Sequence, residues 1–124
     1  MNFREIKLVE GNKYTVVFYD GLIGITTAKV TLVDYYVDKY AQFENSLFLE
    51  VKVGRQRFIR EFTFAPNEPV LIIEGWEKVG FDELYTETIS NGIKHRASNV
   101  LSQSKKWIEC AYNQHKSKTL LYNV

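Results

Sequence analysis

Three arginines alternate with three phenylalanines in one stretch near the middle of the chain, Gly54-Arg55-Gln56-Arg57-Phe58-Ile59-Arg60-Glu61-Phe62-Thr63-Phe64. A guanidinium group binds phosphate through a bidentate fork, and an exposed aromatic ring can stack on any nucleobase. Arg55 and Arg57 lie next to the predicted hairpin turn, so we expect them to be free for a ligand. Phe62 and Phe64 are expected in the core. The alternative is a plain core strand whose arginines lie at a solvated tip.

A second group of candidate residues lies between residues 81 and 96. Phe81 and Asp82 follow a glycine directly, so the ring of Phe81 is expected to stay partly exposed. Asn91 begins a turn dipeptide, where its amide can offer donors and an acceptor to the edge of a base.

Basic residues follow that turn at once, at Lys94, His95 and Arg96. We expect a helix to begin here, and the free N–H groups and dipole of a helix start favour bound anions. The sequence therefore predicts an anion site, with a turn followed by a solvated basic helix surface as the alternative. Lys105, within the predicted helix, is a further candidate. The candidate ligand-binding residues are Phe81, Asp82, Asn91, Arg57, Arg55, Lys94, Arg96 and Lys105.

These residues need a scaffold, and the first three-fifths of the chain is typical of strands. Five stretches rich in β-branched and aromatic residues are separated by turn residues. They are Lys13–Tyr19, Ile25–Tyr36, Ser46–Val53, Gln56–Phe64 and Val70–Trp76. The pattern predicts an antiparallel sheet or meander of about five strands, with a small, partly closed barrel as a variant.

The C-terminal part is expected to be helical. From Ile93 onward, apolar residues recur at helical spacing as far as Tyr112, which predicts a long amphipathic helix of roughly 30 Å. Residues 82–90 fit a short helix capped by Asp82 or an extended segment equally well, and Leu120–Tyr122 fits a tail strand or a dimer contact. The predicted fold class is α+β, as a single domain of residues 1–124 with a β-rich part (1–78) and a helical part (79–124).

The charge distribution favours a small anionic ligand. Lys and Arg number 16 against 15 Asp and Glu, for a net charge of +1. Residues 1–91 carry ten basic and fourteen acidic side chains, and residues 92–124 carry six basic and one acidic, so the two parts have net charges of −4 and +5. Such a local positive charge suits a small nucleotide better than a long nucleic acid.

Several chemistries are not expected. The single Cys110 excludes an internal disulfide framework and a Cys-rich zinc site. His95 and His115 are too far apart on the predicted helix to share a metal, and the usual nucleotide-hydrolase, dinucleotide, metalloprotease and serine-hydrolase motifs are absent. A catalytic carboxylate pair is the weakest interpretation. We therefore expect a cytoplasmic, non-enzymatic protein with no cofactor, no metal and no membrane partner.

Four positions carry a resemblance to a known family: Phe81-Asp82, Asn91 ten residues after the phenylalanine, and Arg57 on the hairpin. At these positions the chain resembles a phage counter-defence family, the anti-Thoeris cyclic-ADP-ribose sponges. The resemblance implies a sheet followed by helical structure, a homodimer or higher homo-oligomer, and sequestration of cyclic ADP-ribose in the host cytoplasm without cleavage. It also implies Phe81 stacked on adenine, Asp82 and Asn91 beside it, and arginines on the phosphates. The chain departs from the family in lacking an arginine well inside the helix, where it has lysines such as Lys105.

Two other classes of function stay open. The strand pattern also resembles Sm-like and SH3-like small barrels, in which the hairpin arginines and helix lysines would follow an RNA backbone. Affinity for RNA would fall steeply with salt, whereas a compact dinucleotide would show a shallower dependence. The third possibility is a protein-interaction module that inhibits a partner enzyme through a tyrosine-rich surface.

Overall fold

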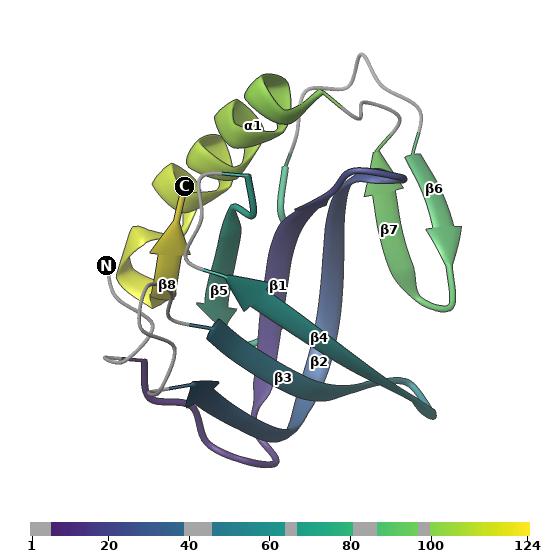
Figure 1. The fold of residues 1–124 in the computed structure, drawn as a ribbon, viewed down its shortest axis with the longest axis vertical. Coiled ribbons are helices and arrows are strands. Elements are labelled where there is room, and N and C mark those ends of the chain that lie inside the picture. The colour runs from purple at the N-terminus through teal and green to yellow at the C-terminus, as the bar shows by residue number, and fades with distance from the viewer. Residues whose placement is uncertain (1–5, 39–45, 64–66, 81–86, 97–99) are drawn as a thin grey trace.

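The computed structural model describes residues 6–38, 46–63, 67–80, 87–96 and 100–124 of the 124-residue chain. These residues form eight strands, one α-helix and one short 3₁₀ helix (Figure 1). In chain order the elements are β1 (Lys13–Asp20), β2 (Gly24–Asp38), β3 (Ser46–Val53), β4 (Gln56–Thr63), β5 (Val70–Glu74), β6 (Glu87–Ser90), β7 (Ile93–Arg96), α1 (Leu101–Gln114), η2 (Lys116–Lys118) and β8 (Thr119–Asn123).

All eight strands join one antiparallel sheet with the order β4-β3-β2-β1-β5-β8, and the β6–β7 hairpin attaches to β2 through β7. The 15-residue strand β2 organises this arrangement. One edge of β2 pairs with β1, while the other pairs first with β7 and then with β3. The pairing with β3 shifts between Leu32 and Asp34, as at a β-bulge, a feature that increases local twist and bends a strand.

The sheet curls, so that β3 and β4 pass over the face formed by β1 and β5 (Figure 1). Contacts between β4 and β1 confirm this closeness, since the ring centroids of Phe18 and Phe62 are 5.4 Å apart. The two end strands of the path, β4 and β8, do not pair with each other, so within the described residues the barrel is not closed.

Apolar side chains cover both faces of the sheet. Alternation along β1 places Tyr14 and Val16 on the inner, concave face and Val17 on the outer face. The inner cluster draws on β1, β2, β3, β4, β5 and β8. The outer cluster is covered by α1, whose buried side chains Trp107 and Ile108 pack against β1 and β5 residues. The helix therefore lies on the face opposite to the concave one.

The structure confirms an α+β protein with an antiparallel sheet, and all five expected N-terminal strands are present. The sheet has three strands more than expected. The expected long helix is wrong, because α1 begins only at Leu101 and its 14 residues span about 21 Å. Ile93–Arg96 is strand β7 instead, since Asn91 and Gly92 both have positive φ (53° and 79°) and reverse the chain onto β6.

The other expectations for the C-terminal part also agree with the structure in some places and differ from it in others. The described residues between 79 and 124 form three strands beside the helix, so this part is not wholly helical. Leu120–Tyr122, for which a tail strand and a dimer contact were both expected as possibilities, lies in strand β8 and pairs with β5. Glu87–Ser90 is extended as β6, while the proposed helix cap Asp82 lies outside the described residues. No helix in the described part of the chain has the length and apolar character needed to cross a membrane.

Removal of the Ile108 side chain tests the role of α1 in covering the outer face. Ile108 is fully buried, so we expect Ile108→Ala to lower the free energy of unfolding by about 2–5 kcal/mol. Cys110→Ala, two residues along the same helix and exposed, should change it by less than about 0.5 kcal/mol. Urea unfolding followed by circular dichroism measures both. Equal effects of the two variants would contradict the assigned orientation of α1.

Candidate ligand-binding site

A cavity of about 240 Å³ lies on the concave face of the sheet, between the β3–β4 hairpin and strands β1, β2 and β7. Its wall is mostly apolar and includes the rings of Phe18, Phe58 and Phe62. It reaches the surface beside Ile23 and Ile59, whose exposed fractions are 46% and 75%. The cavity is the space between the curled β3–β4 hairpin and the strands that it faces.

Arg60 and Asp20 bring charge to this apolar wall. Arg60 Nη1 lies 3.2 Å from Asp20 Oδ2, and the guanidinium carbon lies 4.7 Å from the ring centroid of Phe18 and 5.5 Å from that of Phe62. The Nε atom of Arg60 is buried and has no hydrogen-bond partner in the structure as described. A guanidinium group has five N–H donors, so the bond to Asp20 leaves donors of Arg60 for an acceptor on a ligand.

Asp20 is held in its charged form. Burial raises the pKa of its carboxyl group, but the backbone N–H of Leu22, which donates to Oδ1 at 2.9 Å, and the nearby Arg60 both lower it. The net result is a pKa below the ordinary value of 3.8. The Asp20–Arg60 pair is therefore an ion pair at neutral pH.

His95 and Thr26 form the second polar pair of the cavity. The Oγ1 atom of the buried Thr26 donates to the carbonyl of Gly24 at 3.2 Å and lies 3.3 Å from Nδ1 of His95. The Thr26 hydroxyl accepts from His95 when Nδ1 carries the ring proton and can donate to Nδ1 in the other tautomer. This arrangement fixes the imidazole ring at the cavity wall.

Two of the basic residues expected at the site point away from the cavity. Arg57 is exposed on β4 and lies 3.8 Å from Glu50 Oε1, while its neighbour Phe58 lines the cavity. Lys94 is exposed on β7 and its neighbours Ile93 and His95 line the cavity. Successive side chains of a strand alternate between the faces, so Arg57 and Lys94 belong to the outer surface.

Two further candidates lie at hairpin turns that the fold brings together. Arg55 is exposed at the tip of the β3–β4 hairpin, and Asn91 is exposed at the tip of the β6–β7 hairpin. A Cβ atom on Gly92 would lie 3.0 Å from Cγ1 of Val53, so the two tips are in contact. Val53 also lines the cavity, and Arg55 and Asn91 are therefore near one end of it.

The other candidates are not gathered at this site. Lys105 is half-buried on α1, across the sheet from the cavity. Phe81 and Asp82 lie outside the described residues, as does the side chain of Arg96. The expected helix start at residues 93–96 is wrong, because these residues form a strand and α1 begins after Val100, so Lys94 and Arg96 do not lie at a helix N-terminus.

The sequence reasoning missed Arg60, Asp20, Thr26 and His95 as neighbours in one site. A signal for Arg60 was available, since it shares the period-two face of Phe58 and Phe62 and therefore had to point inward with them. The same pattern could not predict Asp20, Thr26 and His95 as neighbours of Arg60. These residues come from β1, β2 and β7 and share the cavity with Arg60 only through the curl of the sheet.

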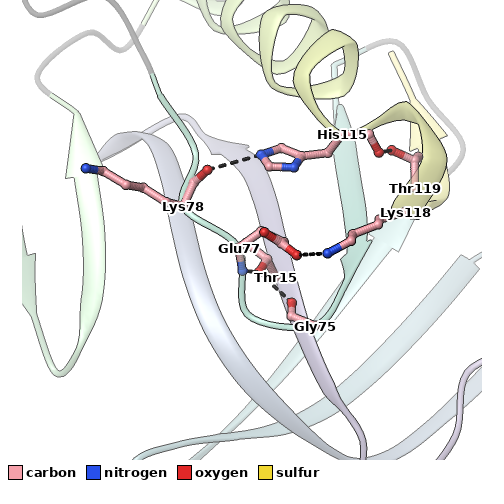
Figure 2. A network of polar contacts seen from close by, with 7 residues as sticks. All are labelled: Thr15, Gly75, Glu77, Lys78, His115, Lys118 and Thr119. Carbon is pink, nitrogen blue, oxygen red and sulfur yellow. Dashed lines mark hydrogen bonds and ion pairs between the residues drawn. The ribbon is translucent and has the colours of Figure 1, made fainter.

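A second polar cluster joins the segment after β5 to the end of α1 (Figure 2). Glu77 forms an ion pair with Lys118, which lowers the pKa of Glu77 and raises that of Lys118 mainly through their shared hydrogen bond. The backbone N–H of Glu77 donates to Thr15 Oγ1 at 2.8 Å, and His115 Nε2 lies 3.1 Å from the carbonyl of Lys78. These groups are paired with each other, so we assign the cluster a structural role.

Comparisons with protein-family models, with curated protein sequences and with solved structures find no match to this chain. The resemblance to cyclic-ADP-ribose sponges and every functional assignment therefore rest on the residues alone.

The charge state of Asp20 predicts a pH dependence. A carboxyl group whose pKa is lowered by folding stabilises the fold above its ordinary pKa, and this contribution is lost as the pH falls through its lower, folded value. We expect Asp20→Asn to be less stable than the wild type at pH 7, by about 1 kcal/mol or less because the pair is partly exposed. The difference should shrink below about pH 3. Urea unfolding across this range measures it, and a difference that does not vary with pH would contradict the ion pair.

Proposed function

We propose that this protein binds a small phosphate-bearing nucleotide in the inner cavity and holds it without converting it. The observation that carries the proposal is the placement of the Arg60 guanidinium beside the rings of Phe18 and Phe62, in an open cavity that Phe58 also lines. An aromatic wall suits a nucleobase because every base has a π-face. A guanidinium group with a spare N–H suits an anionic or carbonyl oxygen on the same ligand.

The size of the cavity limits how much of the ligand it encloses. Its volume of about 240 Å³ is below the roughly 300–1,000 Å³ of pockets that enclose whole drug-sized ligands. We therefore place a base, with part of its sugar, inside the cavity. The phosphates then extend towards the adjoining hairpin tips, where Arg55 and Asn91 are exposed to solvent.

The state of the polar groups favours binding over conversion. An activated hydroxyl nucleophile gives its proton to an adjacent base, whereas the hydroxyl of Thr26 also has the carbonyl of Gly24 as an acceptor at 3.2 Å. The carboxylate of Asp20 is engaged by Arg60 and by the N–H of Leu22. These groups are suited to position a ligand.

More specifically, we propose that the ligand is cyclic ADP-ribose. The protein would sequester it in the cytoplasm of the host cell during phage counter-defence. It follows from the resemblance at Phe81-Asp82, Asn91 and Arg57. The outward direction of Arg57 changes that scheme, because Arg60 replaces it as the arginine inside the cavity.

Isothermal titration calorimetry tests the proposal with cyclic ADP-ribose, ADP-ribose, AMP and a short single-stranded RNA. We expect saturable binding of at least one of the three small nucleotides and recovery of that nucleotide unchanged by mass spectrometry. Arg60→Gln should weaken binding by about 10- to 100-fold, since a hydrogen bond to a charged group contributes about 1.5–3 kcal/mol.

The matched control is Lys52→Gln, which removes a positive charge from the outer face of the adjacent strand β3. It should bind within about twofold of the wild type, because charges outside the site are screened by salt. Binding that is equal in all three proteins would exclude Arg60 from the site. Binding of RNA alone, with a steep loss at high salt, would favour the small-barrel alternative. No binding of any nucleotide would refute the proposal, and chemical change of the bound nucleotide would refute its non-enzymatic part.

A further inference from the structure

Strand β4 presents a free edge. It stands at the end of the strand order and, among the described strands, pairs only with β3. At eight residues, β4 is long for an exposed edge strand. Natural proteins usually cover or interrupt such an edge because it can pair with another chain.

The hairpin geometry identifies the backbone groups on this edge. A two-residue turn joins Val53 to Gln56, and a β-turn bonds the C=O of its first residue to the N–H of its fourth. Val53–Gln56 is therefore a hydrogen-bonded pair, and such pairs alternate along an antiparallel hairpin. The backbone N–H and C=O groups of Arg57, Ile59 and Glu61 consequently point away from β3, towards the free edge.

The side chains of the same three residues form a symmetric pattern. Arg57, Ile59 and Glu61 lie on the outer face of β4, and all three are exposed. The exposed fraction of Ile59 is 75%, which is unusual for a side chain in the middle of a strand. Ile59 also borders a shallow outer groove that holds the stacked rings of Tyr36 and Phe48, so it belongs to an apolar patch.

We propose that two copies of this chain pair through the free edges of β4, antiparallel and about a twofold axis at Ile59. In this register Ile59 lies opposite Ile59 of the second copy, and each Arg57 lies opposite the other copy's Glu61. The pairing is self-complementary, as a twofold interface must be. It buries the exposed isoleucines, forms two cross-strand ion pairs and satisfies the free backbone groups. The proposal does not depend on the proposed nucleotide.

The charges also select the register. Sliding one strand by two residues, the smallest slide that preserves the faces, moves the axis to Phe58 or Arg60 and removes both Arg57–Glu61 pairs. Sliding it by four residues places Arg57 opposite Arg57, or Glu61 opposite Glu61. Like charges directly opposite each other in a sheet are destabilising. On the inner face, the register centred on Ile59 places Phe58 opposite Arg60 of the second copy, and both of these residues line the cavity. The second copy would therefore contribute an arginine beside each cavity mouth.

Charge-reversal variants test the interface by sedimentation equilibrium over a concentration series. The wild type should dimerise, whereas Arg57→Glu should raise the dimer dissociation constant at least about tenfold because it places acidic residues opposite each other. Glu61→Arg should do the same. An equimolar mixture of these two single variants should form a heterodimer, since one carries only acidic and the other only basic residues at these positions.

A matched pair of isoleucine variants separates this edge from surface effects in general. Ile59→Lys should abolish the dimer, whereas Ile89→Lys, at an equally exposed isoleucine on β6, should leave it unchanged. Circular dichroism melting curves establish that each variant is folded. A monomeric wild type, a dimer that persists in Arg57→Glu, or a failure of the mixed variants to associate would each overturn the proposal. Loss of nucleotide binding with the dimer intact would concern only the proposed function.

Discussion

Burial on both faces is the constraint on which this structure depends. The central strands β1 and β5 carry apolar side chains alternately on two sides, and β5 is buried at Val70, Leu71, Ile72 and Ile73 in succession. Water must be excluded from both sides of such strands. The helix α1 covers one side, and the sheet itself covers the other by curling β3 and β4 over β1. The second cover is incomplete, and the cavity is the space that it leaves.

The same curl explains how the charged side chain of Arg60 is accommodated at the cavity wall. Arg60 occupies an inward position between Phe58 and Phe62, where 40% of its side chain stays exposed and its guanidinium is only partly removed from water. Asp20 compensates it, because the end of β1 is carried to the opposite wall of the cavity. The rings of Phe18 and Phe62 provide further favourable contacts with the cation. An acceptor oxygen of a ligand inside the cavity would therefore meet a guanidinium that is already oriented.

Local pattern was sufficient to predict much of the fold. Residues Ser46–Val53 alternate cleanly and form a strand with those bounds, and the apolar stripe through Trp107 and Ile108 is helical and buried. The helix start was misplaced because Ile93 continues the helical spacing by chance, whereas Asn91-Gly92 forms a hairpin turn. The site was harder to predict, since Arg60 lies beside Asp20, and in one cavity with His95, only because the sheet curls, which no local period encodes.

The central claim is that the concave face of the sheet holds the ligand, and nuclear magnetic resonance tests it most directly. Cyclic ADP-ribose, ADP-ribose and AMP are each added to isotopically labelled protein, while the Arg60 Nε–H signal and the ring signals of Phe18 and Phe58 are followed. With at least one nucleotide, we predict that these signals shift and that ligand base protons show nuclear Overhauser contacts to the rings. Shifts confined to outer-face residues such as Tyr36, or to α1, would contradict the account.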